Sequence, residues 1–475
     1  MPLAIVGNGG AAAEAVLALR AHGYAGDIHL FADNDEAPYN PMLGTYLISG
    51  AIPPERVFPF GDKRTFYGGN RVTAHLGSAV VSLDAETQTL VTAEGASYRY
   101  DRCLVATGAR PSLPPVPGLR EALSGEPESR RVFTLRSLED ALGLKNALPR
   151  LAKGPSASRL LNNDAAPSGH HRRARDKDAG SANSGAICAT EDAVSRRPTC
   201  PGGRGFVVQQ PPSPRAAVIG ASLVGVKISA LLRELGLRVR LIEREPHLLP
   251  LAAHPDCARM MEGSLLEDGY ELMLGTSLSR VDAANDKVRL TFGPPGSAAE
   301  TAEDFDLVVV CTGIRPSLAF LTPGQVETAA GILVDDQMRS SVPTLYAAGD
   351  VAQGMNLMSG RQETIALWAS ARYQGRAAGR SLAGAPGGYR GSIPSSISHV
   401  GRMLFASVGH LGDYDRLTAI RDGDTLDLRV WRDERLVGVN LLNCCLPAGA
   451  MKQALQKAAC GATIGTEASW ISFSG

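Results

Sequence analysis

The feature that most constrains the fold of this chain is a unit that occurs twice, about 215 residues apart. Each copy consists of a short apolar strand, a glycine-rich turn, a helix and a second strand that ends in an acid. The first copy begins with the strand 3–6 and the second with the strand 216–219. A repeat this long indicates two duplicated domains rather than a solenoid. The pattern predicts an α/β chain with two Rossmann-like dinucleotide-binding domains.

The first copy carries the pattern G-x-G-x-x-A between its strand and its helix, at Gly7, Gly9 and Ala12. Gly7 permits the tight turn, Gly9 lets a pyrophosphate touch the backbone, and Ala12 lets helix and strand pack closely. Asp33 follows 26 residues after Gly7, at the end of the next strand, where an acid accepts a ribose hydroxyl. In this context a dinucleotide site is a stronger interpretation than an ordinary glycine turn.

The second copy repeats the pattern at Gly220, Ser222 and Gly225, with serine in the second position. Glu243 lies 23 residues after Gly220, at the end of the strand 239–242. A carboxylate there favours the ribose diol of NAD(H) and repels the 2′-phosphate of NADP(H). The neighbouring Arg244 would instead attract that phosphate. We therefore expect NAD(H) ahead of NADP(H).

Each copy is followed by a strand that ends in Thr-Gly and continues, after one residue, with Arg-Pro. These dipeptides are Thr107-Gly108 and Thr312-Gly313, so the two halves repeat at both ends. A further strand, 344–351, contains Gly349-Asp350 and precedes a long amphipathic stretch at 362–382. The combination of two fingerprints, two Thr-Gly strands and a late Gly-Asp is far more specific than any one of them.

With these motifs the chain resembles the FAD- and NAD(P)H-dependent pyridine nucleotide-disulfide oxidoreductase superfamily. The resemblance implies that the first fingerprint holds FAD and the second holds NAD(P)H. It also implies that Asp350 hydrogen-bonds the ribityl chain of FAD and that the turn at Gly349 lies against its phosphates. The FAD site implied in this way comprises Gly7, Gly9, Gly10, Ala12, Asp33, Asn34, Thr107, Gly108, Gly349 and Asp350. The NAD site comprises Gly220, Ser222, Gly225, Glu243, Arg244 and Gly313.

The same resemblance implies a discontinuous FAD-binding domain, with residues 1–111 and 314–390 on either side of an NAD(P)H-binding domain at 112–313. Within the second domain, residues 153–214 are rich in Ala, Ser, Gly, Pro and Arg and lack apolar periodicity. This composition predicts a disordered insertion between a helix near 137–151 and the strand 216–219.

Residues 391–475 change character, because short segments of alternating polarity predict antiparallel strands. A helix is expected near 448–459, so this part is expected to be a C-terminal α+β domain. The expected strands are 402–408, 417–420, 426–431 and 436–442.

The segment 36–43, Glu-Ala-Pro-Tyr-Asn-Pro-Met-Leu, is similar to the Pro-Tyr segment of ferredoxin and rubredoxin reductases. The resemblance implies that electrons pass from NADH through the flavin to a separate iron–sulfur protein or a neighbouring redox subunit. The cysteines agree, because none precedes Cys103 and no CxxC occurs in the chain. A redox-active dithiol beside the flavin or after the second fingerprint is therefore excluded. Cys103 and Cys311 lie in apolar runs and are expected to be inert core residues.

The chain also departs from the reductases that it resembles. These usually have a lysine shortly after the Pro-Tyr segment and a glutamate just after the second fingerprint, which pair near the flavin in related folds. The corresponding positions here are Thr45 and Lys227. Lys227 either supplies the positive charge near the flavin or faces solvent on its helix. For Trp368 we expect core packing, and for His399 a structural role rather than proton donation to the flavin.

The charge balance argues against nucleic-acid or membrane-surface binding. Lys+Arg and Asp+Glu are both 48, so the formal net charge is zero and the sequence pI is about 7.1.

The N-terminal apolar stretch lacks a positive leader and is interrupted by glycines, so it is not expected to be a signal peptide. Eight scattered cysteines without metal-ligand spacing fit a reducing cytoplasm and no bound metal. A homo-oligomer is compatible with the sequence, which sets no oligomeric state.

Two alternative functions stay open. One is an FAD-dependent dehydrogenase or oxidase subunit that acts on a small organic substrate. The other is a cofactor-binding subunit, with little turnover of its own, within a larger redox complex. Stopped-flow reduction of the flavin by NADH discriminates them from a reductase.

Overall fold

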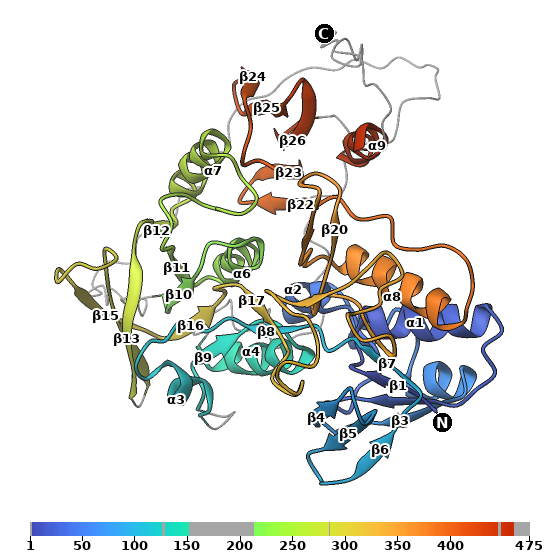
Figure 1. The fold of residues 1–475 in the computed structure, drawn as a ribbon. Helices are drawn as coiled ribbons and strands as arrows, with labels where there is room; N and C mark the ends of the chain where they lie inside the picture. Colours follow the sequence, from blue (N-terminus) through green and yellow to red (C-terminus); the bar gives the residue numbers. More distant parts are fainter. Residues whose placement is uncertain (1, 126–128, 152–212, 285, 445–447, 460–475) are drawn as a thin grey trace, which may run out of the picture.

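The computed structural model describes residues 2–125, 129–151, 213–284, 286–444 and 448–459. The N-terminal residues and the segment that contains α8 lie together on one side of the molecule (Figure 1, blue and orange). The residues between them, in green and yellow, form the opposite side, and the C-terminal sheet lies above both. The expected fold class is confirmed, because mixed α/β parts with parallel sheets are joined to a C-terminal sheet.

The first sheet is five-stranded and entirely parallel, in the order β19-β7-β1-β2-β3. Strand β1 is buried along its whole length, as expected for a parallel strand that is covered on both faces. The strands are β1 (Leu3–Val6), β2 (Ile28–Phe31), β3 (Val72–His75), β7 (Arg102–Val105) and β19 (Leu345–Ala347).

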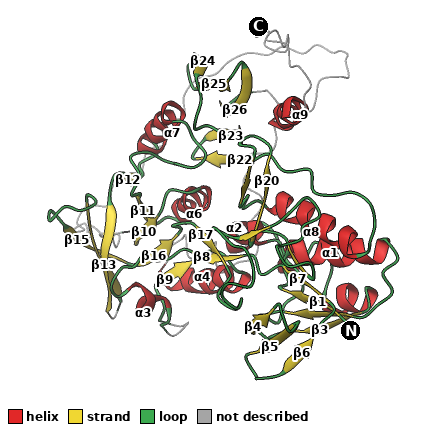
Figure 2. Ribbon diagram, in the orientation of Figure 1, coloured by secondary structure: helices red, strands yellow, loops and turns green. Residues whose placement is uncertain are grey.

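Two helices from distant parts of the chain pack closely on this sheet (Figure 2). They are α1 (Gly10–Ala21) and α8 (Trp368–Leu382). Gly375 of α8 lies so near α1 that a Cβ atom there would overlap the carbonyl oxygen of Ala11. The first sheet is therefore completed by a strand and a helix from residues 345–382, as a discontinuous domain requires. The predicted amphipathic stretch at 362–382 is helical only from Trp368, because its first residues belong to a short strand.

The second sheet is also five-stranded and parallel, in the order β12-β11-β10-β16-β9. Its strands are β9 (Val132–Thr134), β10 (Arg215–Ile219), β11 (Arg238–Ile242), β12 (Glu271–Met273) and β16 (Leu307–Val310). Its helices are α3 (Leu119–Leu123), α4 (Leu138–Leu151), α6 (Leu223–Glu234) and α7 (Pro255–Glu267). Both predicted strand–turn–helix units are thus present, each at the centre of its own sheet.

A two-stranded antiparallel ladder connects the two halves. Strand β8 (Ala109–Pro111) pairs with β17 (Ile314–Pro316), and Arg110 lies opposite Arg315. These are the two Arg-Pro segments that follow the Thr-Gly dipeptides. The repeated sequence therefore forms the two crossings between the nucleotide sheets.

Three small sheets and several short helices complete these halves. The small-sheet strands are β4 (Val80–Asp84), β5 (Thr89–Thr92), β6 (Ser97–Arg99), β13 (Ser277–Ala284), β14 (Lys287–Gly293), β15 (Thr301–Phe305), β18 (Ile332–Leu333), β20 (Ala352–Asn356) and β21 (Arg361–Glu363). The short helices are η1 (Pro41–Leu43), α2 (Gly44–Ile48), η2 (Pro54–Val57) and η3 (Arg64–Gly68).

The C-terminal sheet is antiparallel, in the order β22-β23-β26-β25-β24. It consists of β22 (Ser395–Val400), β23 (Met403–Gly409), β24 (Arg416–Asp422), β25 (Thr425–Arg432) and β26 (Arg435–Leu442), and α9 (Ala448–Ala459) follows. Phe405 and Leu428 join the core around α6 and α7, whereas Met451 and Leu455 of α9 pack with Val439 and Leu441. The sheet is thus sandwiched between the second nucleotide half and its own helix. The four expected strands and the helix are confirmed, while the serine-rich β22 was not predicted.

The predicted insertion at 153–214 lies outside the described residues, apart from its last two positions. Among the residues that the structure describes, no helix is both long and apolar enough to cross a membrane.

Candidate functional site

The carboxyl ends of four parallel strands bring the first set of predicted residues together. Gly7 follows β1, Asp33 follows β2, Thr107-Gly108 follows β7, and Gly349-Asp350 follows β19. Because all four strands run in the same direction, these residues meet at one edge of the sheet. That edge is where open α/β sheets bind their ligands.

The first fingerprint has the geometry that its glycines predict. Gly7 has φ +112°, and a Cβ atom there would overlap the carbonyl oxygen of Ala106. A Cβ atom at Gly9 would meet no atom within 4 Å, so the space beside this residue is open. Gly9 is the N-cap of α1 and offers no side-chain cap to the free N–H groups of the first turn. Open space at an uncapped helix N-terminus fits a pyrophosphate group.

The remaining residues of this fingerprint are held by α8 and by the Gly-Asp turn. A Cβ atom at Gly10 would overlap the ring of Trp368, which is the first residue of α8. The backbone N–H of Gly349 donates to Oε1 of Gln374 at 2.7 Å, and a Cβ atom at Gly349 would lie 3.1 Å from that of Ala11. Trp368 is only partly buried, so it lies at the border of the site rather than deep in the core, where it was expected.

Asp350 forms an ion pair with Arg136, a residue that no sequence motif indicated. Nη2 of Arg136 lies 2.6 Å from Oδ2 of Asp350, and its Nε donates to the carbonyl oxygen of Ala109 at 3.2 Å. Arg136 follows β9, which is an outer strand of the second sheet. The pair therefore joins the carboxyl edges of the two sheets. Gly108 lies beside it, since a Cβ atom there would be 3.9 Å from Nη2 of Arg136.

Asp33 is exposed at the same edge, beside Arg110, a second arginine that was not predicted as a site residue. Its Oδ2 lies 3.7 Å from Nη2 of Arg110, and its Oδ1 accepts a hydrogen bond from Nδ2 of Asn34 at 3.2 Å. Thr107, by contrast, donates its hydroxyl proton to the carbonyl oxygen of Ser317 at 3.1 Å. Thr107 therefore fastens the crossing to β17, while Asp33 stays open to solvent. Ala12 is fully buried, as close packing of helix and strand requires.

The Pro-Tyr segment ties the first fingerprint to the second half of the molecule. The hydroxyl oxygen of Tyr39 accepts a hydrogen bond from the backbone N–H of Leu138, at the start of α4, over 3.2 Å. Burial raises the pKa of Tyr39, so its hydroxyl stays protonated. Nδ2 of Asn8 donates to the carbonyl oxygen of Glu36 at 2.7 Å, and Tyr67 donates to Oδ1 of Asn8 at 2.9 Å. The Pro-Tyr segment thus fixes the position of the first fingerprint relative to α4.

Thr45 and Lys227 lie on adjacent helices, α2 and α6, without forming a hydrogen bond to each other. Nζ of Lys227 lies 4.3 Å from the ring centroid of Tyr46, within the range of a cation–π contact. Oγ1 of Thr45 is buried and has no hydrogen-bond partner within the described part of the chain. A buried hydroxyl without a partner is uncommon in folded proteins. It is free to bond a ligand.

The second fingerprint repeats the first with one difference. Gly220 has φ +98°, and a Cβ atom there would approach the carbonyl group of Cys311 within 3 Å. Ser222 caps α6, because its Oγ accepts from the N–H of Gly225 at 3.3 Å and donates to the carbonyl oxygen of Cys311 at 3.1 Å. Gly225 permits the close approach of helix and strand, since a Cβ atom there would overlap the carbonyl oxygen of Gly220. Gly313 (φ +98°) faces open space.

Glu243 is buried at the carboxyl end of β11. Its Oε2 accepts from the N–H of Ala221 at 2.6 Å, and its Oε1 accepts from the N–H of Glu245 at 2.9 Å. A carboxylate oxygen accepts more than one hydrogen bond, so capacity remains for a ribose hydroxyl. Arg244 is exposed and forms an ion pair with Glu245 at 2.9 Å. Its charge is therefore already matched, which weakens its attraction for a 2′-phosphate.

The two cysteines near these sites are buried. Cys103 and Cys311 lie in the core, as expected, and burial raises the pKa of the Cys311 thiol to about 12. In the described ranges, no group of three or more His, Cys, Asp or Glu side chains is arranged to hold a metal ion. His399, on β22, is exposed and forms no part of either edge.

Comparison with known proteins is consistent with this geometry. A family model described as "Pyridine nucleotide-disulphide oxidoreductase" matches residues 1–161 and 180–375. The chain is 29% identical over 409 residues to the NADH-dependent phenylglyoxylate dehydrogenase subunit epsilon of Aromatoleum evansii, which covers 85% of this chain and 78% of that protein. It is 25% identical to the rubredoxin-NAD(+) reductase of Pseudomonas putida, over 95% of this chain and 98% of that one. The crystal structure of a covalent putidaredoxin reductase–putidaredoxin complex has the same fold, with a TM-score of 0.75, 20% identity, and coverage of 96% of this chain and 92% of that one.

Proposed function

Since this chain belongs to the pyridine nucleotide-disulphide oxidoreductase family, we propose that it passes electrons from NADH through bound FAD to a separate redox protein. It is an FAD- and NAD(H)-dependent oxidoreductase. The observation that carries the proposal is the meeting of two dinucleotide-type sheet edges, joined by the 2.6 Å pair of Arg136 and Asp350. No CxxC or CxxxxC motif occurs in the chain, which supports electron transfer to a separate acceptor.

The first edge is the proposed FAD site. The open space beside Gly9 accommodates the pyrophosphate, the exposed carboxylate of Asp33 accepts ribose hydroxyls, and Asp350 holds the ribityl chain with Arg136 fixing its carboxylate. FAD supplies the capacity to accept two electrons as a hydride and to release them singly. The protein residues bind, orient and exclude water.

Thr45 and Lys227 are the proposed residues on the flavin side of this site. Support comes from the unpartnered hydroxyl of Thr45 and from the contact of Lys227 with Tyr46, which fixes the ammonium group at the junction of α2 and α6. Thr45→Val should weaken FAD binding several-fold, because a ligand hydrogen bond is lost at similar side-chain volume. Fluorescence titration of the apoprotein with FAD measures this effect. An unchanged affinity for FAD in this variant would show that Thr45 does not contact the cofactor.

The second edge is the proposed NAD(H) site, with NADH preferred over NADPH. Glu243→Ala should raise the KM for NADH more than the KM for NADPH, because it removes both a ribose acceptor and the charge that repels a 2′-phosphate. The loss should be on the order of tenfold for NADH, as for a hydrogen bond to a charged group. Arg244→Gln is the matched control and should alter both KM values little. Equal changes in both KM values for the glutamate variant would contradict the ribose role.

The proposed electron acceptor is a small iron–sulfur protein. The proposal rests on the Pro-Tyr segment and on the similarity to a rubredoxin reductase along almost the whole chain. The test is anaerobic NADH-dependent reduction of a rubredoxin or a [2Fe–2S] ferredoxin by catalytic amounts of FAD-loaded protein. Turnover well above the rate with oxygen supports the proposal. Reduction of oxygen alone, with neither protein acting as acceptor, contradicts it.

A second function is favoured by one observation, the similarity to a protein that is named as a dehydrogenase subunit. In that case the acceptor or donor would be a neighbouring redox subunit, and the electron path would continue inside a complex. Native purification distinguishes the two, because a stable complex would co-elute with this chain whereas a soluble carrier would dissociate.

The domain boundaries and the location in the cell are also proposals. The FAD-binding domain is 1–111 with 314–390, the NAD(H)-binding domain is 112–313, and the C-terminal domain begins at 391. The sheets on either side of β8 and β17 support the first two boundaries. A cytoplasmic location is supported by the free, buried thiols of Cys103, Cys257 and Cys311.

A further inference from the structure

A hollow of about 250 Å³ lies beside residues 373–380 of α8. It is bounded by α8, by the segment 388–391 and by Gln456 of α9. Trp368 at the start of α8 marks the FAD edge. At 1.5 Å per helical residue, Arg376 and Arg380 lie about 12 and 18 Å further along the axis. The hollow is therefore separate from the dinucleotide sites.

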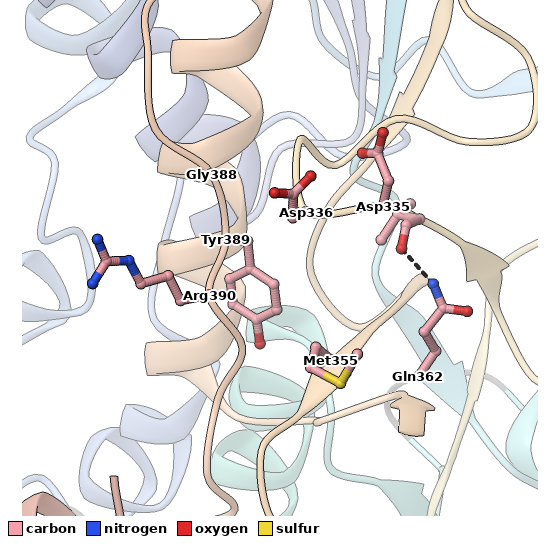
Figure 3. A pocket seen from close by; sticks show the side chains of 8 residues that line it. Asp335, Asp336, Met355, Gln362, Gly388, Tyr389 and Arg390 are labelled. Carbon is pink, nitrogen blue, oxygen red and sulfur yellow. Dashed lines mark hydrogen bonds between the residues drawn. The ribbon is translucent and has the colours of Figure 1, made fainter. Parts of the chain in front are cut away.

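Three arginines are among the described residues that line this hollow, and none of those lining residues is acidic. Arg376 and Arg380 are one helical turn apart, so they share a face of α8. Arg390 comes from the segment opposite, and its side chain points away from Asp335 and Asp336 (Figure 3). Those two acids line a neighbouring hollow of about 430 Å³ on the other side of Tyr389. Residues 388–390 line both hollows, so Arg390 borders the acidic residues of one hollow as well as the arginines of the other.

The guanidinium groups of the basic hollow have few acceptors of their own. Arg376 donates to Glu14 at 2.9 Å, but this carboxylate is shared with Arg372. Arg380 donates from Nη2 to the carbonyl oxygen of Pro386 at 2.6 Å, and its Nε is buried with no partner in the described structure. Arg390 is exposed, and no ion pair to it is found among the described residues. The arginines of the lining therefore carry positive charge that is only partly matched.

The local backbone is built to admit this arrangement. Gly387 has φ +101°, and a Cβ atom there would lie 2.9 Å from Nη2 of Arg380. Any larger residue would therefore displace the Arg380 side chain. The ring of Tyr373, which is 53% exposed, forms the rim, with the guanidinium carbon of Arg376 6.0 Å from its centroid. An apolar or planar group of a ligand could pack against the exposed ring of Tyr373.

We propose that this hollow is a binding site for a phosphate group, either free or carried by a small metabolite. The planar forks of several guanidiniums match the tetrahedral oxygens of phosphate. Because Gln456 belongs to α9, an occupant joins the C-terminal helix to α8. Occupancy should therefore stabilise the contact between these two helices.

Isothermal titration of the FAD-loaded protein, with saturating NAD+ and constant ionic strength, tests the site. The probes are inorganic phosphate, phenyl phosphate and a hexaglutamate peptide. One equivalent of phosphate should bind, at least tenfold more weakly to Arg380→Gln and to Arg390→Gln. Arg361→Gln, an exposed arginine of β21 outside the hollow, should bind as the parent does. Tighter binding of phenyl phosphate than of phosphate would identify an organic phosphate that uses Tyr373, and equal binding would identify the free ion.

Three outcomes would overturn the proposal: no phosphate binding at millimolar concentration, equal affinity in both hollow variants, or binding of the acidic peptide in place of phosphate. The last result would make the hollow a protein-docking surface. Since Arg390 is exposed, its substitution should leave folding and FAD content unchanged, which keeps the test valid if Arg380→Gln is unstable.

Discussion

At the scale of single residues, the site depends on one ion pair that belongs to both halves. Arg136 leaves β9 of the second sheet and meets Asp350, which follows β19 of the first, at 2.6 Å. The side chain of Asp350 is only 11% exposed, so its charge is held largely away from water by this partner. A residue that orients the proposed ribityl acceptor is therefore supplied by the other domain.

Asp350→Ala should lower the FAD content of the purified protein, and Arg136→Gln should do so to a smaller extent. The first change removes the ligand acceptor and leaves Arg136 without its partner, whereas the second only frees the carboxylate. The ratio of flavin to protein absorbance measures occupancy, and we expect a loss on the order of tenfold in FAD affinity for the alanine variant. Asp336→Asn, at an exposed acid elsewhere, is the control. Full occupancy in Asp350→Ala would contradict the assignment.

A histidine pair gives the FAD-side sheet a pH dependence. Nδ1 of His29 lies 3.0 Å from Nε2 of His75, and the His75 ring stacks on Phe31 at 4.5 Å between centroids. Burial, with a further contribution from His29, lowers the pKa of His75. The unfolded chain therefore takes up a proton at a pH where the folded chain does not, so the free energy of unfolding falls as the pH drops below about 6.5.

The histidine prediction is tested by urea unfolding at pH values from 5 to 8. The parent should lose stability below about 6.5, and His75→Phe should flatten that loss because the stacked ring remains while the titrating group is gone. Equal slopes for the parent and the variant would show that another group is responsible.

At the scale of elements, the contact of α1 with α8 is what makes the first domain from two distant segments. Gly375 lies against the backbone of Ala11, and Gly379 lies against that of Ala15. Gly375→Ala should lower the free energy of unfolding by about 1–3 kcal/mol, the usual cost of overpacking.

Gly9→Ala is the informative counterpart, because its Cβ atom meets no protein atom. It should leave the apoprotein folded but lower the affinity for FAD. Chemical denaturation and FAD titration of both variants separate the two effects. Normal FAD affinity in the Gly9 variant would show that the open space beside Gly9 does not hold the pyrophosphate.

The elements could be predicted where local chemistry decides them. The strand–glycine–helix units at Gly7 and Gly220 follow from turn geometry and apolar runs, and both lie where they were expected. Arg136 could not be found in this way, because its role depends on the position of β9 in the sheet and on the partner that the sheet order brings to it. The serine-rich strand β22 was missed because tertiary pairing with β23, not propensity, makes it a strand. The position of Trp368 likewise depends on how α8 meets α1.

At the scale of the whole molecule, three connections hold the two nucleotide edges in a fixed relation. They are the ladder of β8 with β17, the pair of Arg136 with Asp350, and the hydrogen bond from Leu138 to Tyr39. The C-terminal sheet is attached to one of these halves through the buried Asn440. Its side chain accepts from the N–H of His254 at 2.7 Å and donates to the carbonyl oxygen of Ala252 at 3.0 Å. The sheet is thus fastened to the second nucleotide half beside α7. A transfer between two bound cofactors requires this kind of rigid relation.

Electron transfer from NADH to the flavin is tested by anaerobic mixing of the purified, FAD-reconstituted protein with one equivalent of NADH in a stopped-flow spectrometer. We expect rapid loss of the yellow flavin absorbance, and slower reaction in Glu243→Ala. A protein that binds no FAD, or whose flavin stays oxidised in the presence of NADH, would contradict this expectation.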